Sequence, residues 1–158
     1  MTLTRLHPDR PIVSVGAVVI DGDRVLLIKR GHAPLKGQWS LPGGAVEIGE
    51  ELHAALAREV REETCLDIRV GPVVEVLDRI TRDESGRVEY HYVIIDYLCQ
   101  RLGGSLACQT DAEDARWVER TCLGEYSLTP KVTEVIERAF ALATSASRGD
   151  TPARPAAR

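Results

Sequence analysis

Two β-branched runs near the start of the chain predict a β-hairpin. The first run, IVSVGAVVI, covers residues 12–20, and the second, RVLLIKR, covers residues 24–30. The three residues between them, DGD, are of the kind that tight turns favour. Residues 31–43 then bring several glycines and prolines, which predicts a long loop. A loop of that length in a compact domain is usually functional.

A helical period follows this loop and predicts a helix from Glu50 to about Thr64. Its apolar residues recur at i, i+4 and i+8, namely Leu52, Leu56 and Val60. Two acidic residues at the expected start, Glu50 and Glu51, suit the positive end of a helix dipole. The pattern therefore predicts a helix with one apolar face packed on a core.

Strand patterns fill most of the remaining chain. Residues 67–77 and 87–99 alternate as strands around a charged turn, TRDESG, and residues 115–118 form a short strand candidate. Pro130 begins a last predicted helix, because proline is well tolerated in a first turn. Its apolar face carries Val132, Val135, Ile136 and Ala139. Strands and helices mix without strict alternation, which predicts an α/β fold with a mixed sheet covered by helices.

The chain length suits one domain, since 158 residues fall within the usual size of a single core. We expect a polar lead-in over residues 1–11, a domain over residues 12–143 and a tail over residues 144–158. The tail, TSASRGDTPARPAAR, has no large apolar residue, which predicts disorder. The first residues show no apolar stretch of signal-peptide type, so we expect a soluble cytoplasmic protein.

Charge and cysteine content exclude several classes of function. The chain has 20 Lys and Arg against 24 Asp and Glu, a net charge of −4. That balance argues against binding to nucleic acid or an anionic membrane, but not against a phosphorylated small molecule. The four cysteines form no CxxC pair and the four histidines stand at no ligand spacing, which argues against structural zinc.

The residues that suggest chemistry are three acids on the first predicted helix. They are spaced at i, i+3 and i+4, so that a helix places all of them on one face: Glu59, Glu62 and Glu63. Three carboxylates this close repel one another, but a divalent cation bound between them makes the net electrostatic interaction attractive. Oxygen ligands of this kind suit Mg²⁺. The alternative is a solvated helix face neutralised by Arg58 and Arg61. The Gly43-Gly44 turn ahead of the helix favours a metal–phosphate site, because glycine lets backbone carbonyls approach a cation.

The stretch from Gly44 to Leu66 resembles the signature box of the Nudix hydrolases. That box reads Gly, five residues, Glu, seven residues, Arg-Glu-apolar-any-Glu-Glu, any, Gly, apolar. The matching residues are Gly44, Glu50, Arg58, Glu59, Val60, Glu62, Glu63 and Leu66. One place departs, because Cys65 stands where the family has glycine. We expect this change to alter the helix C-cap slightly and to leave the acids in place.

The resemblance implies a Nudix-type α/β/α sandwich with a mixed sheet and a metal-dependent pyrophosphohydrolase. The resemblance makes Glu59, Glu62 and Glu63 metal ligands and candidates for the catalytic base, with Mg²⁺ as cofactor and Mn²⁺ as substitute. The carbonyl of Gly43 becomes a further ligand. Arg58 and Glu50 become an ion pair that holds the turn against the helix.

The resemblance implies roles for further residues, and each of these residues also has a non-functional alternative. Family members add an acid before a late tryptophan strand, and spacing to Trp117 favours Asp111 as that metal ligand. Glu113 and Asp114 are the fallbacks, and a polar turn is the alternative for each. Two residues are candidates for substrate binding, Arg30 through phosphates and Trp39 through stacking on a base. A solvated loop is the alternative for Arg30, and packing is the favoured alternative for Trp39.

The expected substrate is a nucleoside diphosphate linked to another group, cleaved by water attack on phosphorus. ADP-ribose-like compounds and modified nucleoside triphosphates are both candidate substrates. A proline that marks some ADP-ribose-cleaving members is missing near residues 81–82, which weakens that option without removing it. The rival function is a catalytically silent Nudix-fold sensor that binds a nucleotide. A homodimer is expected from the family alone.

Overall fold

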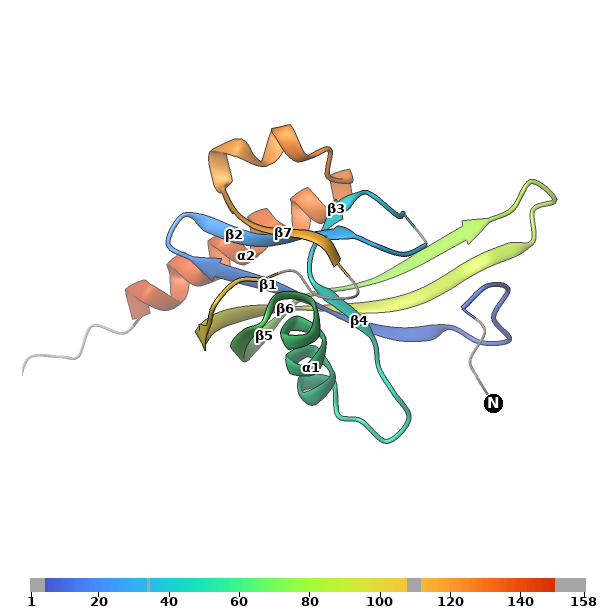
Figure 1. Ribbon diagram of the computed structural model, residues 1–158, viewed down its shortest axis with the longest axis horizontal. Helices are drawn as coiled ribbons and strands as arrows, with labels where there is room; N and C mark the ends of the chain where they lie inside the picture. The colour runs from blue at the N-terminus through green and yellow to red at the C-terminus, as the bar shows by residue number, and fades with distance from the viewer. Residues whose placement is uncertain (1–4, 34, 108–111, 150–158) are drawn as a thin grey trace, which may run out of the picture.

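The secondary structure follows a mixed order of strands and helices (Figure 1). The computed structural model describes residues 5–33, 35–107 and 112–149. The elements are β1 (Ile12–Asp21), β2 (Arg24–Arg30), β3 (Trp39–Ser40), β4 (Gly43–Ala45), α1 (Leu52–Thr64), β5 (Leu66–Arg82), β6 (Val88–Gly104), β7 (Ala112–Glu119), the 3-10 helix η1 (Arg120–Tyr126) and α2 (Pro130–Gly149). Within these ranges, no helix combines the length and the apolar character that crossing a membrane requires.

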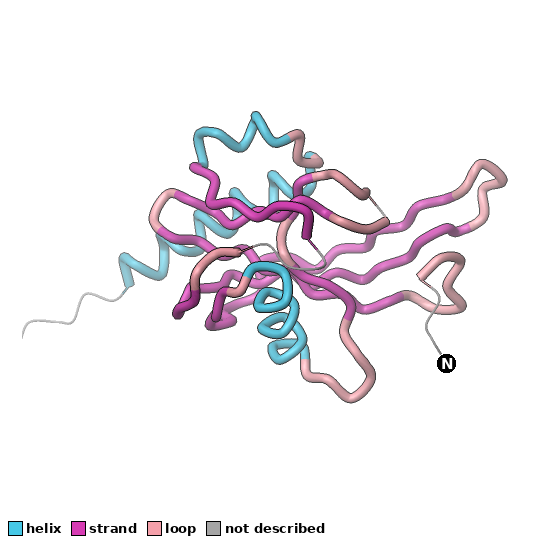
Figure 2. Tube along the Cα trace, viewed as in Figure 1, coloured by secondary structure: helices cyan, strands magenta, loops and turns pink. Residues whose placement is uncertain are grey.

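One mixed sheet of seven strands organises the chain (Figure 2). Its order is β3-β2-β1-β6-β5, while β4 also pairs with β1 and β7 with β2. The predicted hairpin is confirmed, with Ile20 opposite Val25 at the turn. β1 and β6 run parallel, and this pairing places Gly16 opposite Asp96. β4 lies antiparallel on the other side of β1, with Gly43 opposite Gly16.

The two helices cover opposite faces of this sheet. α1 packs on a core that includes Val15, Ala17 and Val19 of β1. α2 packs on a core that includes Val18 of the same strand. Alternate residues of a strand point to opposite faces, so β1 supplies both cores. The predicted α/β/α sandwich with a mixed sheet is confirmed.

Helix α1 has the predicted apolar face but a different start. Leu56 and Val60 are fully buried, as their spacing predicts. The helix begins at Leu52 with Glu51 as its N-cap, so the two acids expected in the first turn precede the helix. At the other end Cys65 adopts a left-handed conformation, with φ 60° and ψ 17°, and its N–H donates to the carbonyl of Arg61. The left-handed C-cap therefore forms without the expected glycine.

Strands β5 and β6 are longer than their local patterns predict. They pair from Leu66 opposite Gly104 to Arg82 opposite Val88, and so form the long hairpin that projects from the body of the fold (Figure 1). β7 likewise extends beyond the predicted residues 115–118, through its pairing with β2. In both cases hydrogen bonding to a neighbouring strand, rather than local periodicity, determines where the strand ends.

Three predictions for the loops and ends need correction. The predicted loop 31–43 contains β3, where Trp39 pairs with Lys29, and ends in β4. The lead-in is not loose where it is described, because the N–H of His7 donates to the carbonyl of Glu89 at 2.8 Å. The predicted disorder of the tail is wrong for residues 144–149, since α2 continues to Gly149. Residues 150–158 lie outside the described residues.

Candidate active site

A cleft of about 660 Å³ opens where the acidic face of α1 meets the sheet. β4 and the neighbouring part of β1 form its floor, and residues of β5, β6 and the beginning of α2 complete its walls. The cleft therefore draws on segments from the whole length of the domain. Its lining combines carboxylates, arginines and apolar side chains.

Helix α1 contributes three carboxylates to this cleft. As the helical spacing predicts, all three line it: Glu59, Glu62 and Glu63. The three side chains differ in how much of their surface is exposed to solvent. The Glu59 side chain is 14% exposed and Glu63 is 5% exposed, whereas the Glu62 side chain is 47% exposed. Two acids thus face inward and the third lies at the mouth of the cleft.

The two glycines ahead of the box make room for these inward acids. A Cβ on Gly44 would lie 2.4 Å from Cδ of Glu59, so any side chain at position 44 would displace that carboxylate. The N–H of Gly43 donates to Oε2 of Glu63 at 2.9 Å. This hydrogen bond holds the turn against the helix and points the N–H of Gly43 at Glu63. The Gly43-Gly44 turn and the three acids therefore lie together in one cleft.

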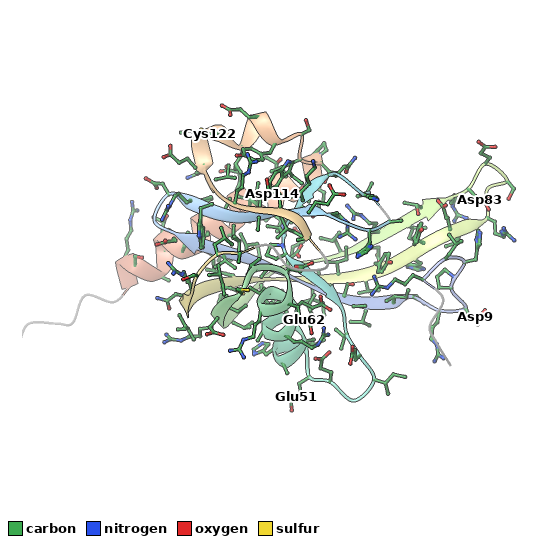
Figure 3. All side chains as sticks on the ribbon, viewed as in Figure 1. Asp9, Glu51, Glu62, Asp83, Asp114 and Cys122 are labelled. Carbon is green, nitrogen blue, oxygen red and sulfur yellow. The ribbon has the colours of Figure 1, made fainter. Side chains whose placement is uncertain are left out.

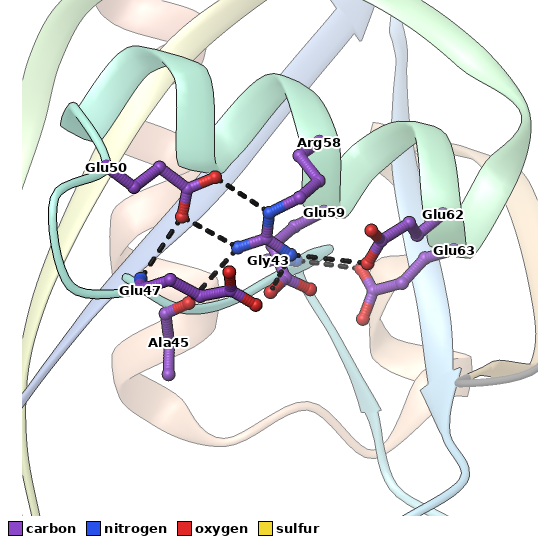
Figure 4. A network of polar contacts seen from close by, with 8 residues as sticks. All are labelled: Gly43, Ala45, Glu47, Glu50, Arg58, Glu59, Glu62 and Glu63. Carbon is purple, nitrogen blue, oxygen red and sulfur yellow. Dashed lines mark hydrogen bonds and ion pairs between the residues drawn. The ribbon is translucent and has the colours of Figure 1, made fainter.

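Arg58 connects the acidic face to the loop before the helix (Figure 4). Its guanidinium forms a two-point ion pair with Glu50, as predicted, with Nε to Oε1 at 2.7 Å and Nη2 to Oε2 at 2.9 Å. Nη1 donates to Oε1 of Glu59 at 2.8 Å and contacts Oε2 of Glu62 at 3.3 Å. The carboxylate of Glu50 also accepts the N–H of Glu47. One arginine therefore fixes the loop and orients two of the three acids.

These contacts shift the pKa of two carboxylates in opposite directions. Hydrogen bonds from Arg58, followed by the backbone N–H of Glu47, lower the pKa of Glu50 to about 2. Burial raises the pKa of Glu59, although Arg58 opposes this effect, and the neighbouring charge of Glu62 adds to it. Glu50 is thus a firmly ionised partner for Arg58. Glu59 is a desolvated acid that gains from any additional positive charge.

The oxygens around α1 are of the kind that holds a hard divalent cation. Among the described residues, no three His, Cys, Asp or Glu side chains are gathered tightly enough to form a complete metal cluster. The donor chemistry nevertheless fits, because Glu59, Glu62 and Glu63 converge on one cleft beside the Gly43 peptide. Carboxylate and carbonyl oxygens without sulfur or imidazole suit Mg²⁺ or Mn²⁺ better than zinc.

Basic side chains line other walls of the same cleft. Arg30, the candidate phosphate-binding residue at the end of β2, lines it together with Arg79 of β5 and Lys131 of α2. Burial, and the nearby charge of Arg30, lower the pKa of Arg79. Two guanidinium groups held this close favour an anionic ligand between or beside them. Arg79 was not singled out from the sequence, because only tertiary pairing brings β5 to this cleft.

Asp96 is a second site residue that the sequence analysis missed. It lies on β6, is 6% exposed and lines the cleft. Burial raises its pKa to about 6, the charge of Glu75 adds to this, and Arg79 and Lys131 act against it. The available signal was the acid itself, alone within the apolar strand pattern HYVIIDYL.

Several predicted site residues do not join the cleft. Trp39 is not part of its lining, and its ring packs edge-on against Tyr126, with ring centroids 5.1 Å apart, which fits the favoured packing alternative. Asp111 lies outside the described residues. The fallback acids Glu113 and Asp114 lie on β7, and Asp114 is well separated from Glu62 in Figure 3. Glu113 approaches Lys29 at 3.8 Å, and Asp114 pairs with Arg116 at 2.7 Å.

Comparison with known proteins identifies relatives over most of the chain. The chain is 36% identical to an ADP-ribose pyrophosphatase of Methanocaldococcus jannaschii over 109 residues, which are 69% of this chain and 62% of that enzyme. It is 31% identical to the 8-oxo-dGDP phosphatase NUDT18 of Homo sapiens over 123 residues, 75% of this chain and 35% of that protein. The match therefore spans less than two thirds of either relative.

Solved structures agree with this sequence relationship. The fold matches a MutT NUDIX hydrolase from Burkholderia pseudomallei with a TM-score of 0.71 and 30% identity, covering 82% of this chain and 98% of that one. The family model of the NUDIX domain matches residues 10–148, which include the entire cleft except its N-terminal border. With the box residues assembled as described, the chain belongs to the Nudix family.

Proposed function

We propose that the protein is a metal-dependent Nudix pyrophosphohydrolase. Its substrate is a nucleoside diphosphate linked to another group, cleaved by attack of water on phosphorus. The observation that carries this proposal is the meeting, in one cleft, of the Glu59, Glu62 and Glu63 carboxylates with basic side chains from β2 and β5. An acidic face alone would repel a pyrophosphate, whereas a face that holds cations beside two arginines binds one.

The proposed metal ligands are oxygens of residues that line the cleft on and beside α1. Glu59, Glu62 and Glu63 would hold Mg²⁺, with Mn²⁺ as substitute, together with the carbonyl of Gly43. Asp111 remains our proposed additional ligand. When bound, the metal supplies charge neutralisation for the pyrophosphate and a lowered pKa for its bound water.

The protein side chains have distinct tasks in this proposal. Arg30 binds the phosphate charge, and Arg58 keeps Glu59 and Glu62 directed at the cleft. One of the three helix carboxylates accepts the proton of the attacking water. The inward position of Glu59 and Glu63 supports their assignment as catalytic residues, and Glu62 completes the set at the mouth.

Two substrate classes remain candidates. The archaeal relative is named for ADP-ribose and the human relative for 8-oxo-dGDP. Both are nucleoside diphosphates with a further group or a modified base, which supports the general class. We propose a small nucleotide of one of these two kinds as the substrate, with no nucleic acid and no membrane as partner.

A nucleotide-binding sensor without activity is the rival function. It would need the cleft and the basic residues but not the full acidic set. The box retains all three acids, the Gly43-Gly44 turn and the Arg58–Glu50 pair, which favours the enzyme.

We further infer a cytoplasmic location and a homodimer. Cys99 and Cys122 are free thiols, which supports a reducing compartment. Exposed apolar residues on the α1 side of the sheet, beyond the helix, support a self-association surface: Val13, Val76 and Ile80. Light scattering of the purified protein measures the oligomeric state, and a monomer at micromolar concentration would contradict the dimer.

A substrate screen tests the proposed activity. ADP-ribose, 8-oxo-dGDP and 8-oxo-dGTP are incubated with the protein and Mg²⁺, Mn²⁺ or a chelator, and the released products are separated and quantified. The proposal expects cleavage at the phosphoric anhydride with either metal and none with the chelator. Nucleotide binding without cleavage of any compound would favour the sensor.

A further inference from the structure

Asp96 occupies a position that the proposed hydrolysis does not use. On β6 it alternates with Tyr97, which belongs to the core under α1, and shares a face with Leu98, which packs on the core under α2. Asp96 therefore lies on the α2 face of the sheet, whereas Glu59, Glu62 and Glu63 come from the helix on the other face. Both groups nevertheless line the same cleft.

The strand beside Asp96 is adapted to its carboxylate. Gly16 of β1 is its direct neighbour in the parallel pairing. A Cβ on Gly16 would lie 2.0 Å from Oδ1 of Asp96, so the carboxylate lies over the bare backbone of the glycine. Alanine at position 16 would have no steric conflict without this acid leaning across the strand. The absence of a side chain at Gly16 therefore makes the space that the Asp96 carboxylate occupies.

Among the residues that the structure describes, the Asp96 carboxylate has no hydrogen-bond or ion-pair partner. Asp96 is only 6% exposed. Its basic neighbours act only at longer range. Lys131 is paired with Glu75 instead, at 3.4 Å, and Arg138 also forms an ion pair with Glu75. A buried carboxylate without donors is costly to the fold. An acceptor kept in that state, and facing a cleft, is available to donors on a ligand.

We propose that Asp96 determines substrate specificity by accepting two adjacent hydrogen-bond donors from the nucleoside half of the substrate. This inference rests on the proposed function for the identity of the ligand as a nucleotide. The phosphate half is excluded from this position, because Asp96 and Glu75 would both repel it. The surrounding lining is suited to a nucleoside, since Leu77, Val132 and Val135 give it apolar surface.

Few groups of a nucleoside match an ionised carboxylate. Its two oxygens only accept, so the matching group must present two donors side by side. Guanine does so with its ring N–H and its amino group, and ribose does so with its cis-diol. Adenine, cytosine and uracil each place an acceptor next to their donor, and that acceptor would face a carboxylate oxygen. Asp96 therefore selects a guanine-type base or a ribose diol, which correspond to the two substrate classes of the proposed function.

Binding of uncleavable nucleotides tests this proposal without requiring turnover. The α,β-methylene diphosphates of guanosine, 2′-deoxyguanosine, xanthosine and adenosine are titrated by calorimetry into wild type, Asp96→Asn and Gly16→Ala, with Mg²⁺ present. Asparagine keeps the shape but replaces one acceptor with a donor. Xanthine matches that change, because it carries a carbonyl where guanine has its amino group.

The two sources of paired donors give different results. If guanine is bound, wild type prefers guanosine to xanthosine by about tenfold or more, and Asp96→Asn reverses this order. If the diol is bound, wild type prefers guanosine to 2′-deoxyguanosine, and Asp96→Asn removes that preference. In both cases Gly16→Ala weakens the preference by displacing the carboxylate. Ratios between two ligands are insensitive to a general loss of stability, which would affect both equally.

A matched control and two contrary outcomes complete the test. Asp23→Asn removes an exposed carboxylate at the turn between β1 and β2, outside the cleft lining, and should leave both ratios unchanged. Ratios that stay within about twofold of wild type in Asp96→Asn and Gly16→Ala would overturn the proposal, as would absence of binding of all four analogues to wild type. Failure of the proposed activity is separable, because it appears as intact binding without cleavage in the substrate screen.

Discussion

The guanidinium of Arg58 is held by the carboxylate of Glu50 through two parallel contacts, at 2.7 and 2.9 Å. This pair joins the loop ahead of α1 to the middle of the helix. The remaining nitrogen of the guanidinium is thereby directed at Glu59, 2.8 Å away. Arg58 therefore acts as a positioning residue between the loop and the proposed metal ligands.

Replacing Arg58 with lysine should impair activity more than stability. Lysine keeps the charge but has no planar fork, so it cannot hold Glu50 at two points and Glu59 at a third. We expect Mg²⁺ affinity or kcat to fall about tenfold to a hundredfold, the range seen for groups that orient metal ligands. Arg61→Lys is the matched control, because Arg61 lies on the same helix, is exposed and, among the described residues, forms its ion pair with Asp67 rather than with the three acids. Equal losses in the two variants would contradict the role of Arg58.

Replacing Cys65 with glycine should stabilise the protein. Cys65 has φ 60° at the end of α1, and a side chain in the left-handed region costs about 1–2 kcal/mol. Removing the Cβ relieves that cost, so we expect urea unfolding to show a gain of about 1 kcal/mol. Cys65→Ala keeps a Cβ and should gain nothing. A Cys65→Gly variant no more stable than Cys65→Ala would show that the cap carries no strain.

Replacing Asp96 with asparagine should change how stability depends on pH. Burial raises the folded-state pKa of Asp96 from 3.8 to about 6, so its contribution to stability is fully present below pH 3.8 and is lost as the pH rises through 6. Asparagine does not titrate. The free energy of unfolding of Asp96→Asn, relative to wild type, should therefore increase between pH 4 and pH 8, by up to about 3 kcal/mol. Urea denaturation at the two pH values measures this, and a difference independent of pH would contradict it.

The parts of the fold that follow local periodicity could be predicted from the sequence. The hairpin of residues 12–30 and the buried face of α1 follow from alternation and from the spacing of Leu56 and Val60. The ends of β5 and β6 could not be predicted, because pairing between the two strands carries both past their apolar cores. Helix α2 ends later than the sequence predicts, at Gly149, for a related reason. A helix already packed on a core can continue into polar residues.

Some residues of the candidate site could likewise be predicted from local spacing, and others could not. The acids of the box lie on one helix, so their spacing alone places them together. Arg79 and Asp96 reach the cleft only through the register of β5, β6 and β1, which no local pattern reports. Packing was already the favoured interpretation of Trp39, but its partner, Tyr126, could not be identified because it is distant in sequence.

Mg²⁺ should raise the thermal stability of the protein through the same helix face. A bound cation relieves the repulsion among the three acids and stabilises the folded state by RT ln(1+[L]/Kd), about 2.7 kcal/mol at a hundredfold excess over Kd. The shift should shrink when Glu59, Glu62 or Glu63 becomes glutamine, and shrink far less in Asp111→Asn if that acid joins only with substrate. Melting curves of chelator-treated protein with and without Mg²⁺ measure the effect. The same shift in wild type and in all three glutamate variants would place the metal elsewhere.

Turnover of Glu59→Gln and Glu63→Gln at saturating Mg²⁺ tests the central claim most directly. Glutamine keeps the size of each side chain, and at position 63 its amide oxygen can still accept the N–H of Gly43, so the fold should survive. Loss of the charge that holds the cation should reduce kcat by about a hundredfold or more, with melting curves and circular dichroism unchanged in form. A folded variant of either kind that kept near wild-type kcat would contradict the assignment of these carboxylates to the catalytic metal site.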